Sequence, residues 1–508
     1  MNSKILRLAV LPFLLLASCS TTKTSANNNG SASSSESDTA SSSPSSPSSE
    51  YTPIIREPTE ITLWSITGKN NQAQLQNYID EFMKLEPNVK VNNVIQTGMN
   101  YNGLADTVIK GFTANNYPDI VQAYPDAVAQ FIEYNKAVKL DDYINNETYG
   151  WSAEDKSDII STFLEEGENY SIAGTYSLPY CKSTEALYYN EDVLLGLNLS
   201  SIDATINNGK PLSASYLNNL TWEEFFGKLC PAIVSYNDSL PEDSKIIKTN
   251  GTYSAVLGYD SDDNLFITLA EQYGIGYTSL DASGSGVYNF GIGEDKTKME
   301  TLLTKWHEYA SKGYVISKGS AGNTYTNSFF NAQQTLFSVG STGGVKYQFS
   351  STNPMNVGVT HLPHAEGHDL KTINQGPSLA VLDHNDENRK LASWLLYKTI
   401  TNKENSLDWA LNSGYMGIRH SDFEDETYQE ASDYTTKDSK TLDRLIALNM
   451  AYYGDRAVTD SLFTSPAFVG SAEARQQVSG IMTKVLTKTS DISEIDTWFT
   501  DAYNNCTK

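Results

Sequence analysis

Cysteine is scarce in this sequence, with four among 508 residues. Cys19 lies close to the N-terminus, and the others are Cys181, Cys230 and Cys506. If Cys19 is set apart, as argued below, three remain, and three cannot all pair within one chain. No disulfide framework therefore supports the fold, although a single bridge among these three stays open.

Basic side chains are also few. The chain has 36 Lys and Arg against 61 Asp and Glu, which gives a net charge of −25 and a pI near 4.6. A protein that binds a polyanion needs a basic face to displace counterions. The charge balance therefore argues against nucleic acid as a partner, and its simplest role is solubility.

Long hydrophobic runs are missing beyond the N-terminus, so no later segment is expected to span a membrane. At the N-terminus, Lys4 and Arg7 precede the apolar run Leu8–Leu16, which is too short to cross a bilayer as a helix. The run ends in Leu-Ala-Ser-Cys, which resembles the lipobox of bacterial lipoprotein signal peptides. The resemblance implies that residues 1–18 are a signal peptide and that Cys19 is lipidated. The alternative is an ordinary secretory signal with an incidental cysteine.

Residues 19–58 are rich in Ser, Thr, Asn and Ala. Such a segment cannot bury enough apolar surface to order itself. Two or more acyl chains on Cys19 would hold a soluble domain firmly at a membrane. We therefore expect a disordered tether between a lipid anchor and a folded body, on the extracytoplasmic side of a bacterial cell membrane.

Motifs for nucleotide chemistry or hydrolysis are absent as well. The sequence has no P-loop, no G-x-S-x-G, no H-E-x-x-H and no kinase motif set. His361, His364 and His368 have a spacing that suggests a metal site, but Pro363 and Gly367 break any shared helical face. We therefore predict neither a metal site nor a cofactor.

The body that starts at residue 59 follows an α/β pattern. Ile61–Ile66 and Val89–Ile95 read as strands on either side of a helix that Pro87 ends, and a second helix leads to a strand at Asp119–Ala123. Strands that alternate with helices imply parallel pairing. Further strong helical patterns occupy the segments beginning at Trp222, Met299, Asn388 and Ser471.

Several motifs in a fixed order carry a family resemblance. They are "YPDIVQAYPDAVAQF" (117–131), "LPYCKSTEALYYNEDVL" (178–194), "TWEEFFGKL" (221–229), "FSVGSTGGVKYQ" (337–348), "INQGPSLAVLDHNDENRKLASWLLYKTITNKEN" (373–405) and "NSGYMGIRHS" (412–421). Together they resemble the extracellular solute-binding proteins of carbohydrate ABC transporters. The resemblance spans residue 60 to the C-terminus.

The resemblance implies a type II periplasmic-binding-protein-like fold, in which two α/β lobes are joined by hinge strands and the ligand binds in the cleft between them. Residues 59–184 and 376–414 would form lobe 1. Residues 185–375 and 415–508 would form lobe 2. The polar stretch from Cys181 to Glu185 would then lie at the first hinge crossing, where short side chains can face the cleft.

Nine residues are candidate ligand contacts. Matching to the glycerol-phosphate-binding branch of the family suggests six of them, which are Tyr101, Asp126, Ser183, Thr342, Gly376 and Tyr415. Asp260 and Asp263 lie where that branch has an aromatic-rich loop, and Trp64 could stack on a sugar ring. Each has a plain structural alternative, such as a turn hydroxyl for Ser183, hinge packing for Tyr415, a solvated helix start for Asp126 and core burial for Trp64.

One feature of that branch has no counterpart here. The Arg that clamps the phosphate near the C-terminus matches a segment with Phe468 and Gly470, and the nearby Arg475 lies inside a helical pattern. The sequence therefore argues against a phosphoryl ligand.

The resulting hypothesis is a lipid-anchored, monomeric substrate-binding protein that captures a mono- or oligosaccharide by hinge closure and delivers it to ABC permease subunits. It is not expected to be an enzyme. The alternatives are a secreted glycoside hydrolase or lyase, for which no carboxylate pair stands out, and a surface adhesin or scaffold.

Overall fold

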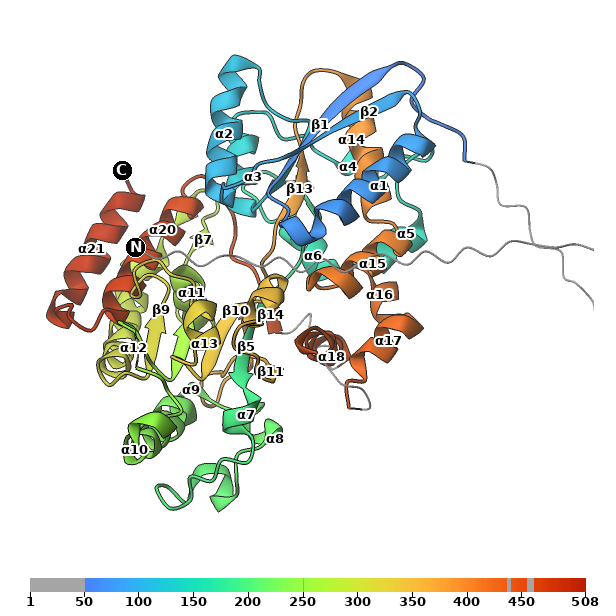
Figure 1. The fold of residues 1–508 in the computed structure, drawn as a ribbon. Coiled ribbons are helices and arrows are strands. Elements are labelled where there is room, and N and C mark those ends of the chain that lie inside the picture. The colour runs from blue at the N-terminus through green and yellow to red at the C-terminus, as the bar shows by residue number, and fades with distance from the viewer. Residues whose placement is uncertain (1–50, 250, 436–439, 455–460) are drawn as a thin grey trace, which may run out of the picture. The chain divides into compact units, whose positions relative to one another are not determined.

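Two β-sheets organise the folded body, and their strands come from interleaved stretches of the sequence (Figure 1). A computed structural model describes residues 51–249, 251–435, 440–454 and 461–508, and residues 52–508 form one compact unit. The predicted signal peptide, Cys19 and the tether up to residue 50 lie outside the described residues. The fold is mixed α/β with two lobes, one around each sheet, as predicted.

The first sheet has the strand order β2-β1-β3-β13-β4, with β1 parallel to β2 and β3 and with β13 antiparallel to β3 and β4. Successive side chains of a strand point to opposite faces. Ile61 and Leu63 of β1 accordingly belong to the core under α1 and α14, whereas Trp64 packs against the cluster under α2 and α3. The elements of this layer are β1 Thr59–Ser65, α1 Gln72–Leu85, β2 Val89–Ile95, α2 Tyr101–Ala114, β3 Ile120–Ala123, α3 Pro125–Glu133, β4 Leu178–Pro179, β13 Ser378–Val381 and α14 Glu387–Ile400.

The second sheet has the order β11-β5-β10-β6-β9, in which β5 is antiparallel to both β10 and β11. Its core includes the buried faces of α11, α12, α20 and α21. The elements are β5 Glu185–Asn190, α9 Trp222–Glu224, α10 Cys230–Ser239, β6 Leu257–Tyr259, α11 Asp262–Gln272, α12 Gly293–Ser311, β9 Val315–Ser317, α13 Asn327–Asn331, β10 Phe337–Ser341, β11 Val357–Thr360, α20 Ser471–Leu486 and α21 Ile495–Cys506.

The remaining α-helices and β-strands connect and cover these layers. They are α4 Asp141–Ile144, α5 Ala153–Asp158, α6 Ser161–Glu166, α7 Glu191–Leu194, α8 Ala214–Leu217, β7 Ser279–Leu280, β8 Gly286–Val287, β12 Thr372–Ile373, α15 Lys403–Ser413, α16 His420–Glu424, α17 Glu426–Ser432, α18 Thr441–Gly454 and β14 Leu462–Phe463.

The helix predicted from Trp222 begins there with a side-chain cap, because the Thr221 hydroxyl accepts a hydrogen bond from the Glu224 N–H (3.1 Å). It then widens into a π-helical turn at Phe225–Leu229 before α10. Pro231 supplies no N–H to an α-helical ladder, which accounts for a change of hydrogen-bond register at this point.

Among the described residues, three segments pass between the two sheets. The first leads from β4 to β5, the second runs from β12 to β13, and the third follows β14 to Ala467. Ser183 and Gln375 pair in an antiparallel bridge between the first two segments, and β14 pairs in parallel with β12. Ala467 then bridges to Tyr170 in the first lobe. These three segments, held together by the bridges and by the β12–β14 pair, join the lobes.

The first lobe includes residues that the sequence analysis places before it. The composition places residues 51–58 in the tether, but Ile55 is 1% exposed and belongs to the first lobe's core. The backbone N–H groups of Ile54 and Ile55 donate to the Glu86 carboxylate at 2.8 and 2.9 Å. The apolar pair at 54–55 has a burial partner that the Ser-rich composition of the preceding segment concealed.

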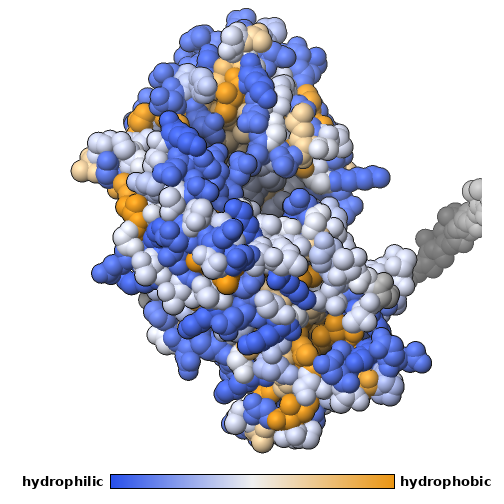
Figure 2. All heavy atoms as spheres, turned by 90° about the vertical axis from the view of Figure 1, so that its left-hand side faces the viewer, coloured by the Kyte–Doolittle hydropathy of each residue, from blue (hydrophilic) through white to orange (hydrophobic). Residues whose placement is uncertain are grey.

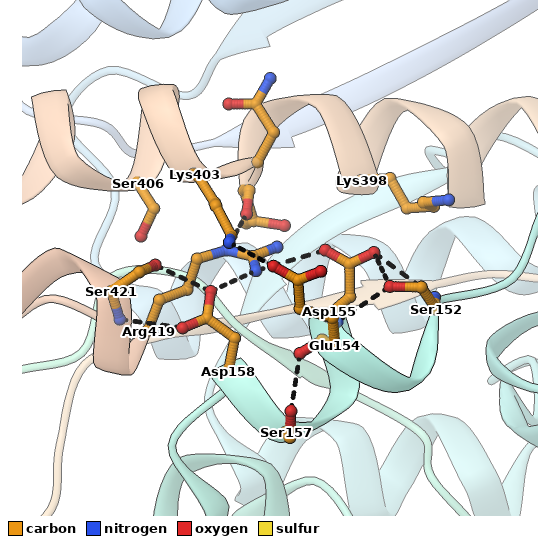
Figure 3. A network of polar contacts seen from close by, with 12 residues as sticks. Ser152, Glu154, Asp155, Ser157, Asp158, Lys398, Lys403, Ser406, Arg419 and Ser421 are labelled. Atoms are coloured by element: carbon orange, nitrogen blue, oxygen red, sulfur yellow. Dashed lines mark hydrogen bonds and ion pairs between the residues drawn. The ribbon is translucent and has the colours of Figure 1, made fainter.

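The segment after residue 414 is anchored in the first lobe. Met416, Ile418 and Phe423 belong to the core around the first sheet. Figure 3 shows the polar side of this attachment, where the Arg419 guanidinium donates to Asp158 at 2.9 Å. Arg419 Nε also donates to the backbone oxygen of Thr401 at 2.8 Å. This packing differs from the predicted assignment of residues 415–508 to lobe 2, and the lobe boundaries at 184, 375 and 414 stay predictions.

Three further observations bear on the sequence analysis. Cys181, Cys230 and Cys506 are all free, so none of the bridges left open by the sequence forms.

Within the described ranges, no helix combines the length and the hydrophobicity that crossing a bilayer requires. The face of the molecule drawn in Figure 2 is mainly hydrophilic, with small scattered apolar patches, as its acidic composition leads us to expect.

Candidate functional site

A cavity of about 50 Å³ lies where the segments between the two sheets meet. From the first lobe it is lined by the start of α3 and the end of α6. From the second lobe it is lined by the loop after α11 and by α20, and the connecting segments 373–375 and 464–466 complete the wall. Cavities between lobes are common places for small-molecule sites. This one has room for a few water molecules and is too small for a disaccharide.

Four of its lining residues carry buried polar atoms without a hydrogen-bond partner among the described residues. They are Tyr277 Oη, Thr278 Oγ1, Asn374 Oδ1 and Gln375 Nε2. Tyr277 and Asn374 are only 8% and 5% exposed. Buried polar groups are nearly always paired, and an unmet one costs about 1–3 kcal/mol. This wall is therefore suited to a guest that both donates and accepts several hydrogen bonds.

Aromatic rings accompany these polar groups. Tyr124 and Tyr277 line the cavity, and Tyr101 packs edge-on against Tyr124 with ring centroids 4.9 Å apart. Burial raises the pKa of Tyr124 to about 12, so its hydroxyl stays protonated and can donate at neutral pH. Tyrosine rings offer a flat apolar face together with a hydroxyl, which is the combination that a sugar ring requires.

Arg475 is the basic group of the cavity. Its Nη2 lies 2.9 Å from Asp263 Oδ2 and 2.5 Å from Asn264 Oδ1, and its Nε lies 3.7 Å from Asp126 Oδ2. Burial by itself lowers the pKa of Arg475, but the carboxylates of Asp263 and Asp126 outweigh burial and raise it. Because α3 and α20 belong to different lobes, the Arg475–Asp126 contact spans the cleft.

A second ion pair, between Lys182 and Glu166, lies at the hinge beside the cavity. Lys182 Nζ lies 2.5 Å from Glu166 Oε2 and donates to Gly376 O at 3.1 Å. Glu166 lines the cavity and also accepts from Asn374 Nδ2 and Ser378 Oγ at 3.2 and 3.3 Å. Both charged side chains are buried, at 0% and 4% exposure, so each depends on the other for compensation.

The predicted contact residues fall into two groups. Five lie at or beside the cavity. Asp126 lines it, Gly376 follows the lining residue Gln375, Ser183 pairs with Gln375, Tyr101 packs on Tyr124, and Tyr415 is hydrogen-bonded to Tyr101. Their contact with a ligand stays a prediction.

The other four are tied into the protein itself. Thr342 Oγ1 accepts from the Thr184 N–H at 3.1 Å, and Asp263 is joined to Arg475. Asp260 Oδ1 accepts from the N–H and the hydroxyl of Thr326 at 2.5 and 2.7 Å, and burial raises its pKa. Trp64 packs under α2 and α3 and is not among the residues that line the cavity.

The sequence analysis missed Glu166, Tyr277, Asn374 and the role of Arg475. A signal for Arg475 was present, because it lies three residues before Val478 and seven before Met482, on the face that carries the buried stripe of α20. A charged residue on such a face needs partners. His361, His364 and His368 are not part of a metal-ligating cluster, since the described residues contain no group of side chains that could hold a metal ion.

Glu185 connects the cavity to the start of β5. It is 1% exposed, and it accepts from Tyr259 Oη at 2.5 Å and from Asn264 Nδ2 at 3.2 Å. Asn264 also contacts Gln375 and Arg475, so this acid is two hydrogen bonds from the cavity wall. Burial raises the pKa of Glu185 from 4.5 to about 8, with a smaller contribution from Asp263 and Asp260.

We expect this carboxyl to make folding stability depend on pH. Between pH 4.5 and 8 the folded protein keeps a proton that the unfolded chain has lost, so stability falls as pH rises through that window, by up to about 1.4 kcal/mol per pH unit. Glu185→Gln keeps an acceptor for Asn264 and removes the titration. Urea unfolding at pH 6 and pH 7.5 should show a loss for the wild type about 2 kcal/mol larger than for the variant. Parallel pH profiles would refute this assignment.

A cavity lined by unpartnered polar groups between two hinge-connected α/β lobes is the arrangement of a solute-binding protein. Residues 77–436 match the family described as bacterial extracellular solute-binding protein, and the chain belongs to this family. Membership implies an extracytoplasmic location. No curated protein matches the chain in sequence.

Solved structures share the fold at low identity. UgpB from Mycobacterium tuberculosis, in complex with glycerophosphocholine, is 16% identical with a TM-score of 0.65, covering 88% of this chain and 97% of that one. The GacH receptor of Streptomyces glaucescens is 15% identical with a TM-score of 0.62, covering 89% and 99%. The cyclic α-maltosyl-1,6-maltose binding protein from Arthrobacter globiformis is 15% identical with a TM-score of 0.61, covering 88% and 99%.

Proposed function

We propose that this protein captures a carbohydrate outside the cytoplasm and delivers it to the permease of an ABC importer. The observation that carries the proposal is the set of four unpartnered polar atoms on Tyr277, Thr278, Asn374 and Gln375 around the cavity between the lobes. Sugar hydroxyls both donate and accept, so they can meet such a set, and the rings of Tyr124 and Tyr277 can cover C–H faces. The structures of GacH with acarbose and of the A. globiformis protein, named for its maltosyl ligand, support this class of ligand.

Hinge opening is part of the proposal. A cavity of about 50 Å³ is too small for a disaccharide, so we expect the lobes to separate before one enters. A ligand that contacts Asp126 of one lobe and Tyr277 of the other then favours the closed state, by no more than its preference for that state. The closed form would present the surface that the permease recognises. Ligand capture makes and breaks no covalent bond, and we expect no hydrolytic activity.

Attachment to the membrane through Cys19 is a further part of the proposal, supported by the lipobox-like sequence and the Ser-rich segment that follows it. It predicts that the full-length protein fractionates with membranes and that Cys19→Ser releases it. Equal fractionation of the two would exclude the lipid anchor.

The ligand class can be tested with a panel of saccharides by thermal shift followed by calorimetry. A ligand at 100 times its Kd should add about 2.7 kcal/mol to the free energy of unfolding. Ser183→Ala and Tyr415→Phe should each weaken binding of the saccharide found by about tenfold, because each removes one hydroxyl beside the cleft, while Tm without ligand changes little because the Tyr415 ring keeps its packing on Trp409. Unchanged affinity would remove these residues from the site. A panel without any stabilising saccharide, or release of product from one, would overturn the function.

A further inference from the structure

The charges around Arg475 distinguish between kinds of carbohydrate. This guanidinium reaches the cavity from α20. An arginine in a ligand cavity usually favours an anion, because its fork of N–H donors fits phosphate and carboxylate. The surroundings of Arg475 determine whether it can serve an anion here.

Arg475 is already matched by acidic groups. Asp263 Oδ2 lies 2.9 Å from Nη2, and Asp126 Oδ2 lies 3.7 Å from Nε on the opposite side of the cleft. The other acid of the cavity wall, Glu166, is paired with Lys182 at 2.5 Å. Two carboxylates thus face the Arg475 guanidinium, and the other nearby cation, Lys182, is paired with Glu166. Among the residues that the structure describes, the cavity wall therefore has no unpaired positive charge to attract an anion.

We propose, on the basis of the proposed carbohydrate-binding function, that this cleft selects uncharged saccharides and excludes sugar phosphates and sugar acids. Arg475 donates to ligand hydroxyls, and Asp126 and Asp263 are the residues that reject anions.

The physical reason lies in what each ligand does to the ion pairs. A hydroxyl can accept from Arg475 and donate to Asp126 at the same time, so the three groups all remain paired. A phosphate or carboxylate can only compete with Asp126 or Asp263 for the guanidinium. It would leave a largely buried carboxylate without its partner and beside a like charge, which is the repulsive element that specificity requires.

The test compares each neutral saccharide of a panel with its own uronate and phosphate, for example glucose with glucuronate and glucose 6-phosphate, by calorimetry on the full folded body. The wild type should bind the neutral member of a pair at least 100-fold more tightly. Asp263→Asn keeps one oxygen that can accept from Arg475, replaces the other oxygen with an amide NH2 group and removes the negative charge. It should therefore improve binding of the anionic member by about tenfold. Arg475→Gln should weaken the neutral member by at least tenfold.

Glu133→Gln is the matched control, because Glu133 is an exposed carboxylate at the far end of the helix that carries Asp126. It removes one negative charge without altering the cavity, so it should leave the ratio of neutral to anionic binding unchanged. An equal gain in anion binding for Glu133→Gln and Asp263→Asn would show that overall charge sets the preference, and would overturn the proposal.

The outcomes separate this proposal from the function on which it rests. Tight binding of a sugar phosphate or a sugar acid by the wild type overturns the charge assignment and leaves carbohydrate capture intact. Absence of binding for every neutral and every anionic member overturns both. Retention of neutral binding in Arg475→Gln would show that the guanidinium only packs between Asp126 and Asp263.

Discussion

Lys182→Met is expected to lower the free energy of unfolding by about 3–5 kcal/mol. The substitution leaves the Glu166 carboxylate, which is 4% exposed, without the cation that lies 2.5 Å from it. It also removes the donor to Gly376 O on the second connecting segment. A charge stranded in the interior costs far more than the ion pair contributed in its favour, so removal of one partner is the damaging change. Urea unfolding of the full folded body measures the loss.

Two variants serve as controls for this prediction. Lys90→Met removes a lysine of similar geometry, 3.0 Å from Glu60, but those side chains are 67% and 56% exposed, so the loss should stay below about 1 kcal/mol. In Glu166→Gln with Lys182→Met, the amide can still accept from Asn374 and no charge is stranded, so most of the stability should return. A loss at Lys182 no larger than at Lys90, or no recovery in the double variant, would contradict a stranded charge as the cause.

The local elements were predictable because their determinants are short-range. The stripe Leu75, Tyr78, Ile79, Phe82 and Leu85 predicts α1, and the first four side chains are buried while Leu85, at the end of the helix, is half-buried. Val89–Ile95 forms the strand predicted, and the helix predicted from Ser471 extends to Leu486. Each of these depends on a period of two or 3.6 residues and on a nearby stop signal, which a single sequence displays directly.

The cavity was predictable only in part, because its contacts join residues that are far apart in the chain. Asp126 and Arg475 meet across the cleft although no local pattern links them. The same applies to Arg419, whose partner Asp158 lies in another helix and holds the segment after residue 414 against the first lobe. Family resemblance indicated Asp126 and Gly376 by motif, but it contained no equivalent for Arg475, so the charge arrangement became visible only with the fold.

We expect Gly376→Ala to lower the free energy of unfolding more than the addition of a methyl group at any other hinge position. Gly376 has φ of +92°, and a Cβ built on it would lie 1.8 Å from the backbone oxygen of Cys181. The positive φ alone costs an alanine about 1–2 kcal/mol. The overlap is with backbone, which cannot rotate away as a side chain can, so the segments around Cys181 and Gly376 must move apart. We expect a total loss above about 4 kcal/mol.

Gly367→Ala separates the two contributions. Gly367 has φ of +77°, and a Cβ on it would meet no atom within 4 Å, so this variant carries the backbone strain without the overlap. It should lose only about 1–2 kcal/mol and should keep its affinity for the saccharide. Gly376→Ala should lose both stability and binding, because the displaced segment carries Gln375 and the Lys182 contact to Gly376 O. Equal losses in the two variants would show that the close approach of Gly376 to Cys181 does not hold the hinge together.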